Sequence, residues 1–164
     1  MIIKNDKMES ILEMFNIYNK PEYFSPKLSQ LINPVFLELN ECILLKQNEG
    51  SRSINVDYII SAFGDRTGFE AFDSHIHLID YIDEFRFGII EGLRFFLQLS
   101  ILWGTKLKDT FPQYKFHIVL FYNGDNCILR FHRLRDNESP WVDINSINDY
   151  TKEALLVNVI NDNR

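Results

Sequence analysis

The sequence has little of what marks secreted, redox-active or metal-binding proteins. Its 164 residues contain only two cysteines, Cys42 and Cys127, and neither belongs to a CxxC pair. The first ten residues, MIIKNDKMES, include no apolar run of signal-peptide length, and acids already occur at Asp6 and Glu9. Two cysteines in a chain without a secretion signal are expected to be reduced and buried rather than bridged. We therefore expect a cytoplasmic protein without metal or redox sites built on sulfur.

Recognisable catalytic and nucleotide-binding motifs are also lacking, and so is an excess of positive charge. Lys and Arg number 17 against 23 Asp and Glu, which gives a formal net charge of -6. This balance disfavours nucleic acid and anionic membranes as partners and favours a basic protein. We expect no cofactor and no enzymatic activity.

What the sequence does have is the composition of one globular domain spanning residues 1–164. Hydrophobic residues make up 46% and charged residues 24%, and a chain of this length buries about two thirds of its unfolded surface. Aromatic residues are unusually frequent at 14%, with 14 Phe. The surplus phenylalanines are expected in the core or in a binding surface.

The stretch DEFRFGIIEGLRFFLQLSILWGTKLKDTF predicts a long central helix over about residues 83–110, with Asp83 as its N-cap. Its polar residues form a narrow stripe, which we expect to be the only part of the helix in water: Glu84, Glu91, Arg94, Gln98, Thr105 and Lys108. Charged residues inside the apolar run argue against a membrane span, since each costs roughly 2.5 to 3.5 kcal/mol at a bilayer centre. A face of small residues should seat a crossing strand or helix: Gly88, Gly92, Ser100 and Gly104.

Helices are expected first in the chain and strands later. The predicted helices span Asp6–Asn19, Ser25–Lys46 with an interruption at Pro34, and Val56–Phe63, with an exposed loop at 47–53. Phe69–Ile82 is predicted to be one strand or a bent pair, Ile144–Tyr150 a helical turn after the loop 136–140, and Ala154–Ile160 a final strand. This order indicates an α+β domain with a mainly antiparallel sheet packed on the central helix.

The strongest local signal is a hairpin formed by Lys115–Tyr122 and Cys127–Leu134 around Asn-Gly-Asp-Asn. A loop of two or four residues places the apolar residues of both strands on one face. His117, Arg130 and His132 would then share the opposite face.

Two histidine pairs are candidate sites. His75 and His77 are two residues apart on a predicted strand, so they face the same way and could share a metal, but a zinc site needs further ligands that the sequence does not supply. The alternative without a metal is a structural pair of half-buried strand histidines. His117 and His132 could perform acid–base chemistry beside Arg130, although cross-strand polar pairs on a solvated face give the same pattern.

An acidic cluster and one aromatic residue are the candidate partner-binding residues. Asp80, Asp83 and Glu84 lie where the predicted strand meets the central helix, and the dipole of that helix already accounts for them. If the protein binds a basic partner, we expect contact there and at Asp73. Trp141 is either an interface anchor or, as we favour, a lid on the core.

Several segments of the second half resemble immunity proteins of bacterial contact-dependent growth inhibition and related polymorphic toxin systems. The resemblance covers about residues 67–160 and is carried by SHIHLIDYIDEF, FGIIEGLRFFLQL, FHIVLFYN, ILRFHRLRDNESPWVD and EALLVNVI. It implies a cytoplasmic, non-enzymatic protein that binds one toxin domain, often a nuclease with a basic surface. These immunity proteins span several folds, so the resemblance implies a role but no binding residues.

Three functions follow as hypotheses. The first is an immunity protein that neutralises a cognate toxin by covering its active site or the surface beside it. The second is a metal-dependent hydrolase using His75 and His77 with nearby carboxylates. The third is a non-catalytic subunit of a stable complex, which includes a homodimer.

Overall fold

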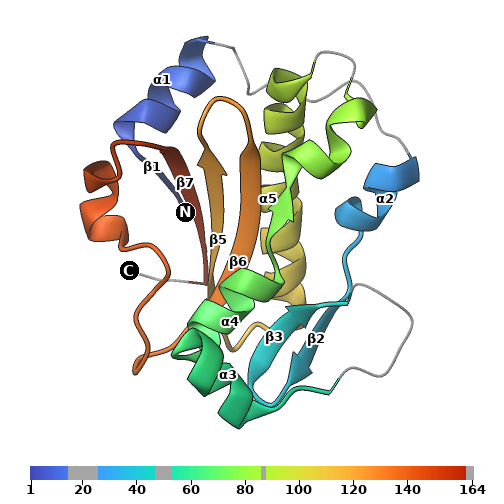
Figure 1. Cartoon of the computed structure of the whole chain (residues 1–164), viewed down its shortest axis with the longest axis vertical. Helices are drawn as coiled ribbons and strands as arrows, with labels where there is room; N and C mark the ends of the chain where they lie inside the picture. Colours follow the sequence, from blue (N-terminus) through green and yellow to red (C-terminus); the bar gives the residue numbers. More distant parts are fainter. Residues whose placement is uncertain (15–25, 47–52, 86–87, 162–164) are drawn as a thin grey trace.

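The computed structural model describes residues 1–14, 26–46, 53–85 and 88–161. Five antiparallel strands form one sheet in the order β1-β7-β5-β6-β4, and a separate hairpin pairs β2 with β3 (Figure 1). The strands are β1 (Ile2–Lys4), β2 (Phe36–Leu39), β3 (Cys42–Leu45), β4 (Ile76–His77), β5 (Lys115–Tyr122), β6 (Cys127–Leu134) and β7 (Ala154–Ile160). The α-helices are α1 (Asp6–Met14), α2 (Pro26–Ile32), α3 (Val56–Phe63), α4 (Arg66–Asp73) and α5 (Ile89–Thr110), and the 3-10 helices are η1 (Leu78–Glu84) and η2 (Ile144–Asp149). The predicted α+β domain with an antiparallel sheet on a long helix is confirmed.

The long helix α5 packs on one face of the sheet, and the side chains between the two form an apolar core. Trp103, Phe96 and Phe131 are fully buried there, and the Trp103 ring meets the Phe131 ring edge-on at 6.0 Å. The predicted seat of small residues is confirmed at Gly92 and Gly104 but not at Gly88, which precedes the helix and where a Cβ would meet nothing within 4 Å. A Cβ on Gly92 would lie 2.4 Å from Leu78 of η1, and a Cβ on Gly104 would lie 2.6 Å from Ile160 of β7. These two glycines therefore set how closely η1 and β7 approach the helix.

The first residue of α5 and the residues that it exposes to solvent differ from the prediction. The helix begins at Ile89 after Gly88, whose φ of 67° suits glycine, so Asp83 belongs to η1 and caps nothing in α5. Glu91 in the predicted stripe is buried, whereas Ile101 and Leu102 are 41% and 44% exposed. The expectation that only the polar stripe meets water is therefore wrong.

Two other predicted elements are also wrong. The second helix ends at Ile32, and residues up to Leu45 form the β2–β3 hairpin instead, because Asn40 and Glu41 adopt positive φ values of 48° and 65° that suit a two-residue turn. The predicted strand 69–82 is mostly helical. Asp65 accepts a hydrogen bond from the Gly68 N–H at 2.6 Å and begins α4, so only Ile76–His77 pairs as a strand.

The remaining predictions are confirmed where the structure describes them. The β5–β6 hairpin has the register expected for a four-residue loop, with Tyr122 opposite Cys127 and His117 opposite His132. The helix 56–63, the turn at 144–149 and the last strand also occur. Both cysteines are free and buried. The first helix is confirmed over Asp6–Met14, whereas its predicted continuation to residue 19 and most of the loop at 47–53 lie outside the described residues.

Helix α4 completes the edge of β6 with side chains instead of a strand. The Ser74 hydroxyl donates to the Phe131 carbonyl at 2.8 Å and accepts from the Phe131 N–H at 2.9 Å. One turn earlier, the fully buried Glu70 carboxylate accepts from the N–H groups of Arg133, at 2.7 Å, and Ile43, at 2.6 Å. Glu70 thereby joins the small β2–β3 hairpin to the main sheet.

A guanidinium completes the shell around Glu70. Arg135 donates to both of its carboxylate oxygens, at 3.1 and 2.7 Å. Burial raises the pKa of Glu70, and Arg135 and the two backbone N–H groups oppose that rise by stabilising the carboxylate. The charge is thus buried with all of its partners in place.

None of the helices in the described residues is long and apolar enough to cross a membrane. Only η1 and α5 taken together reach that length and composition, and they are bent by 115° relative to each other.

Candidate functional site: the open sheet face

The face of the sheet opposite α5 is only half covered. Over β7 and β5, the segment carrying Val142 and Ile147 packs on Val119 and Val157 and closes a small second core (Figure 1). Over β6 and β4, the described residues leave the side chains of this face partly exposed. The side chains of this open part define what we call the open sheet face: Phe72, His75, His77, Phe121, Ile128, Arg130 and Trp141.

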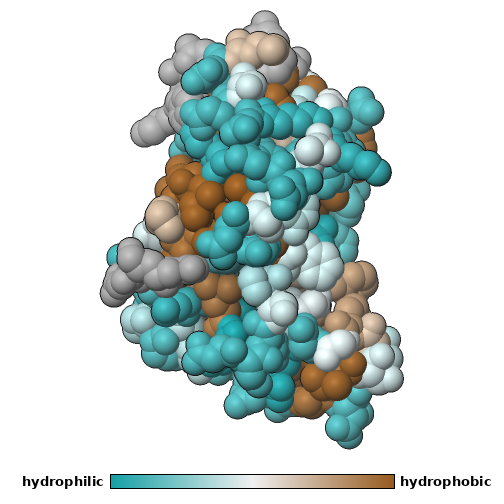
Figure 2. Space-filling model, turned by 90° about the vertical axis from the view of Figure 1, so that its left-hand side faces the viewer, coloured by the Kyte–Doolittle hydropathy of each residue, from teal (hydrophilic) through white to brown (hydrophobic). Residues whose placement is uncertain are grey.

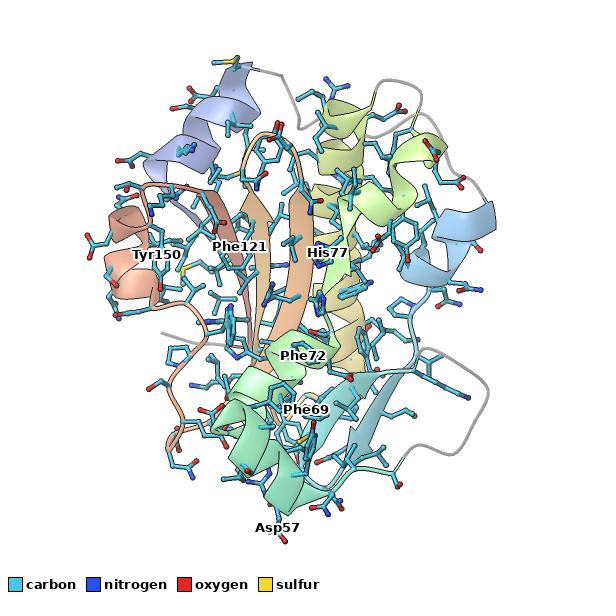
Figure 3. The ribbon with its side chains drawn as sticks, in the orientation of Figure 1. Asp57, Phe69, Phe72, His77, Phe121 and Tyr150 are labelled. Carbon is cyan, nitrogen blue, oxygen red and sulfur yellow. The ribbon has the colours of Figure 1, made fainter. Side chains whose placement is uncertain are left out.

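Strand register brings together the members of the open sheet face that lie on β4, β5 and β6. Ile128 of β6 lies opposite His77 of β4 on one side and opposite Phe121 of β5 on the other. Side chains opposite each other in adjacent strands share a face. The labelled side chains of Phe72, His77 and Phe121 accordingly occupy neighbouring positions at the centre of Figure 3.

The two sequence-predicted histidines lie within this face. The His75 and His77 rings meet edge-on at 5.0 Å, which confirms that they point the same way, and the Phe72 ring lies 5.4 Å from His75. His75 Nδ1 bonds with the Phe72 carbonyl, and His77 Nδ1 lies 3.1 Å from the Asn126 side-chain amide. Within the described parts of the chain, no group of three or more His, Cys, Asp or Glu is placed to hold a metal ion. The described chain therefore gives the metal-dependent alternative no third ligand.

Arg130 lies at the centre of the open sheet face between two aromatic rings. Its guanidinium carbon is 5.3 Å from the Phe121 ring centroid and 5.2 Å from the Trp141 centroid, both within cation–π range. Burial lowers the pKa of Arg130, while the charge of Glu153 opposes the change. Its Nε is buried and has no hydrogen-bond partner among the described residues.

Trp141 forms the other wall of this arrangement and is not a lid on the apolar core. Its side chain is 43% exposed and covers a guanidinium instead. Its backbone N–H donates to His132 Nε2 at 3.4 Å, and His132 Nδ1 lies 3.2 Å from the Arg133 carbonyl. A neutral His132 that carries its proton on Nδ1 satisfies both bonds.

His117 and His132 face each other as predicted, but they are buried. They are 1% and 0% exposed, with ring centroids 5.4 Å apart. Burial, and secondarily the neighbouring His117, lowers the pKa of His132 to about 3. The alternative of a polar pair on a solvated face is therefore wrong, because both rings are buried.

The acidic cluster borders the open sheet face on the side of β4. Asp80 and Asp83 are exposed on η1, Glu84 is half-buried on the same element, and Asp73 is half-buried at the end of α4. Since η1 is separate from α5, the dipole of the central helix does not account for these acids. Trp141 comes from the opposite side, so the predicted residues flank one surface without forming a single cluster.

Sequence reasoning missed the centre of this surface. Arg130 was expected on the polar side of the hairpin, but nothing in its local pattern indicates that Phe121 and Trp141 enclose it. The β5–β6 pairing predicts that Phe121 and Arg130 share a face, and this was the one available signal.

Comparison with known proteins identifies the family of this chain. No curated protein and no solved structure matches the chain. A family model matches residues 3–164, nearly the whole sequence, and the chain belongs to the Uncharacterized protein PM0498 family.

Proposed function

We propose that the chain is a toxin-neutralising immunity protein that binds its cognate toxin domain through the open sheet face. The observation that carries this proposal is the surface itself. Phe72 and Trp141 are 54% and 43% exposed on either side of Arg130, which has no carboxylate partner among the described residues. Exposed aromatic residues and arginine are the types that dominate the binding energy of protein interfaces.

Charge supports a basic partner. The whole chain carries a formal charge of -6, and Asp80 and Asp83 place exposed carboxylates on the border of the open sheet face. Complementary charge at a rim speeds encounter and excludes wrong partners, whereas buried aromatic anchors slow dissociation. A nuclease toxin, whose surface must attract nucleic acid, fits this pattern. The role as an immunity protein rests on the resemblance of residues 67–160.

The test is co-expression with the toxin domain encoded by the adjacent gene in the native host. We expect a one-to-one complex on sizing chromatography and protection of cells from the toxin. The double substitution Phe72→Ser with Trp141→Ser should abolish both, while its thermal unfolding stays close to wild type. Failure of the wild-type protein to bind or protect would overturn the proposal.

The chain offers a matched control surface. Ile2 of β1 lies opposite Asn158, whose amide donates to the Ser100 carbonyl of α5 at 3.0 Å, so Ile2 is on the face of the sheet that α5 covers. Ile2 and Ile101 are 43% and 41% exposed. Figure 2 looks onto the side of the molecule that carries β1 and shows apolar side chains gathered at its surface. The substitutions Ile2→Ser and Ile101→Ser remove comparable exposed apolar groups and should leave binding intact.

A further inference from the structure

The guanidinium of Arg130 is held in place but not neutralised. The ring centroids of Phe121 and Trp141 lie 5.3 and 5.2 Å from its carbon atom and hold it in place. In the described chain no carboxylate lies within salt-bridge distance of it, and its buried Nε has no hydrogen-bond partner. Burying part of a charge without a partner costs free energy, so the fold alone gives no reason for an arginine here.

Other arginines of the chain show what a structural arginine looks like. Arg135 bonds to Glu70 at 2.7 Å with its side chain 7% exposed, and Arg66 bonds to Glu41 at 3.1 Å. Each closes a contact between two elements of the fold. Arg130 forms no ion pair with the described residues, and the rings of Phe121 and Trp141 fix its orientation in advance of any binding partner.

The geometry of the Arg130 guanidinium indicates which chemical group would bind it. A planar guanidinium with fixed orientation offers parallel N–H donors that match the two oxygens of a carboxylate. Its cross-strand neighbour on β5 is Val119, and His75 continues the β4 register on the other side, so neither strand places a second arginine or lysine opposite it. A single positive charge in an acidic protein suits a singly charged carboxylate better than a phosphate dianion.

We propose that Arg130, held between Phe121 and Trp141, is a carboxylate-binding site whose natural ligand is an Asp or Glu side chain of the partner docked on the open sheet face. The source of the carboxylate rests on the proposed function, whereas the site itself does not. The toxin surface would then combine a basic border with one acidic side chain opposite Arg130. This pattern of charge would exclude partners that are uniformly basic.

The site is tested first without any partner. The Nε–H signal of Arg130 in a nitrogen–proton NMR spectrum, assigned by its loss in Arg130→Lys, is followed while sodium acetate replaces sodium chloride at constant ionic strength. We expect a saturable shift with acetate that is larger than the shift with inorganic phosphate. No saturable shift, or tighter binding of phosphate, would overturn the proposal.

Glu153 provides the control for an internal partner, because its charge is felt at Arg130 without an ion pair between them. The acetate shift should persist in Glu153→Gln. A shift that appears only in that variant would mean that Glu153 occupies the site in solution, which would also overturn the proposal.

The second test uses the toxin complex. Arg130→Gln and Arg130→Lys should each weaken toxin binding about 30-fold or more, because both lose the planar fork, and only the lysine variant keeps the charge. Unchanged toxin binding in both variants would refute the partner carboxylate even if acetate binds. A protein that binds acetate but no toxin would refute the proposed function and leave the site standing.

Discussion

Two charged side chains of this protein, Glu70 and Arg130, lie in opposite circumstances. Glu70 is fully buried and accepts hydrogen bonds from two backbone N–H groups and from both arms of Arg135. Arg130 is half-buried and has two aromatic rings beside it but no carboxylate among the described residues. The first charge completes the fold. The second charge is oriented by the fold but has no oppositely charged partner among the described residues.

The Glu70 region should therefore be where substitution costs most. Glu70→Ala removes the carboxylate that Arg135 binds with both of its arms and leaves two buried N–H groups without their acceptor, and we expect a loss of about 3 to 5 kcal/mol in the free energy of unfolding. Glu41→Gln, which breaks only the exposed pair with Arg66, should cost at most about 1 kcal/mol. Urea unfolding of both variants measures the contrast. Equal losses would show that Glu70 is not the joint between the hairpin and the sheet.

The buried histidine beneath Trp141 should make stability depend on pH. The pKa of His132 is lowered to about 3 in the folded state, against an unfolded value near 6.5, so its contribution is fully present above pH 6.5 and is lost as the pH falls toward 3. We expect a loss of roughly 2 kcal/mol by pH 5, because each pH unit contributes about 1.4 kcal/mol. His132→Gln should flatten this slope, whereas His75→Gln should keep it. Parallel slopes in wild type and His132→Gln would contradict the assignment.

Arg130 should matter far less to the fold than Glu70 does. Arg130→Met removes two cation–π contacts but also removes a partly desolvated charge, so the free energy of unfolding should change by less than about 1 kcal/mol. Urea unfolding under the conditions used for Glu70→Ala makes the two numbers comparable. A loss of several kcal/mol would make Arg130 a structural residue and remove the contrast.

The smallest effect on stability is expected at the rim of the open sheet face. Phe72→Ser trims a side chain that is 54% exposed, so it should change the free energy of unfolding by about 0.5 kcal/mol or less. Phe69→Ser on the same helix, where the side chain is 8% exposed, should cost several times more. Thermal unfolding of the two variants is sufficient to test this. Equal losses would mean that Phe72 is part of the core.

The parts of the fold that the sequence predicted are those with regular periodicity. Alternation along β5 and β6 predicted the hairpin and the face shared by Arg130 and His132, and the spacing in α5 predicted a long buried helix. The register is that of the four-residue loop, one of the two lengths left open. The failures fall where a local device overrides the pattern. Asp65 begins α4, which continues into the predicted strand 69–82, and Asn40 and Glu41 turn the chain where a helix was expected.

The candidate site was predictable only in its parts. His75, His77 and Trp141 stand out in the sequence, and the strand register places the two histidines beside Arg130. The enclosure of Arg130 depends on the loop that carries Trp141, which returns across the sheet to bond with His132. The role of Glu70 could not be predicted, because a single acidic residue in a short helix does not indicate that four hydrogen-bond donors will surround it.

Hydrogen exchange of the chain with and without its toxin domain tests the central claim most directly. Two of the exposed apolar surfaces among the described residues can be compared, the open sheet face and the area of β1 and α5 that carries Ile2 and Ile101. The account predicts that the toxin protects peptides covering residues 72–80 and 126–142 and leaves 1–5 and 98–106 unchanged. Protection confined to β1 and α5, with none around Arg130 and Trp141, would contradict it.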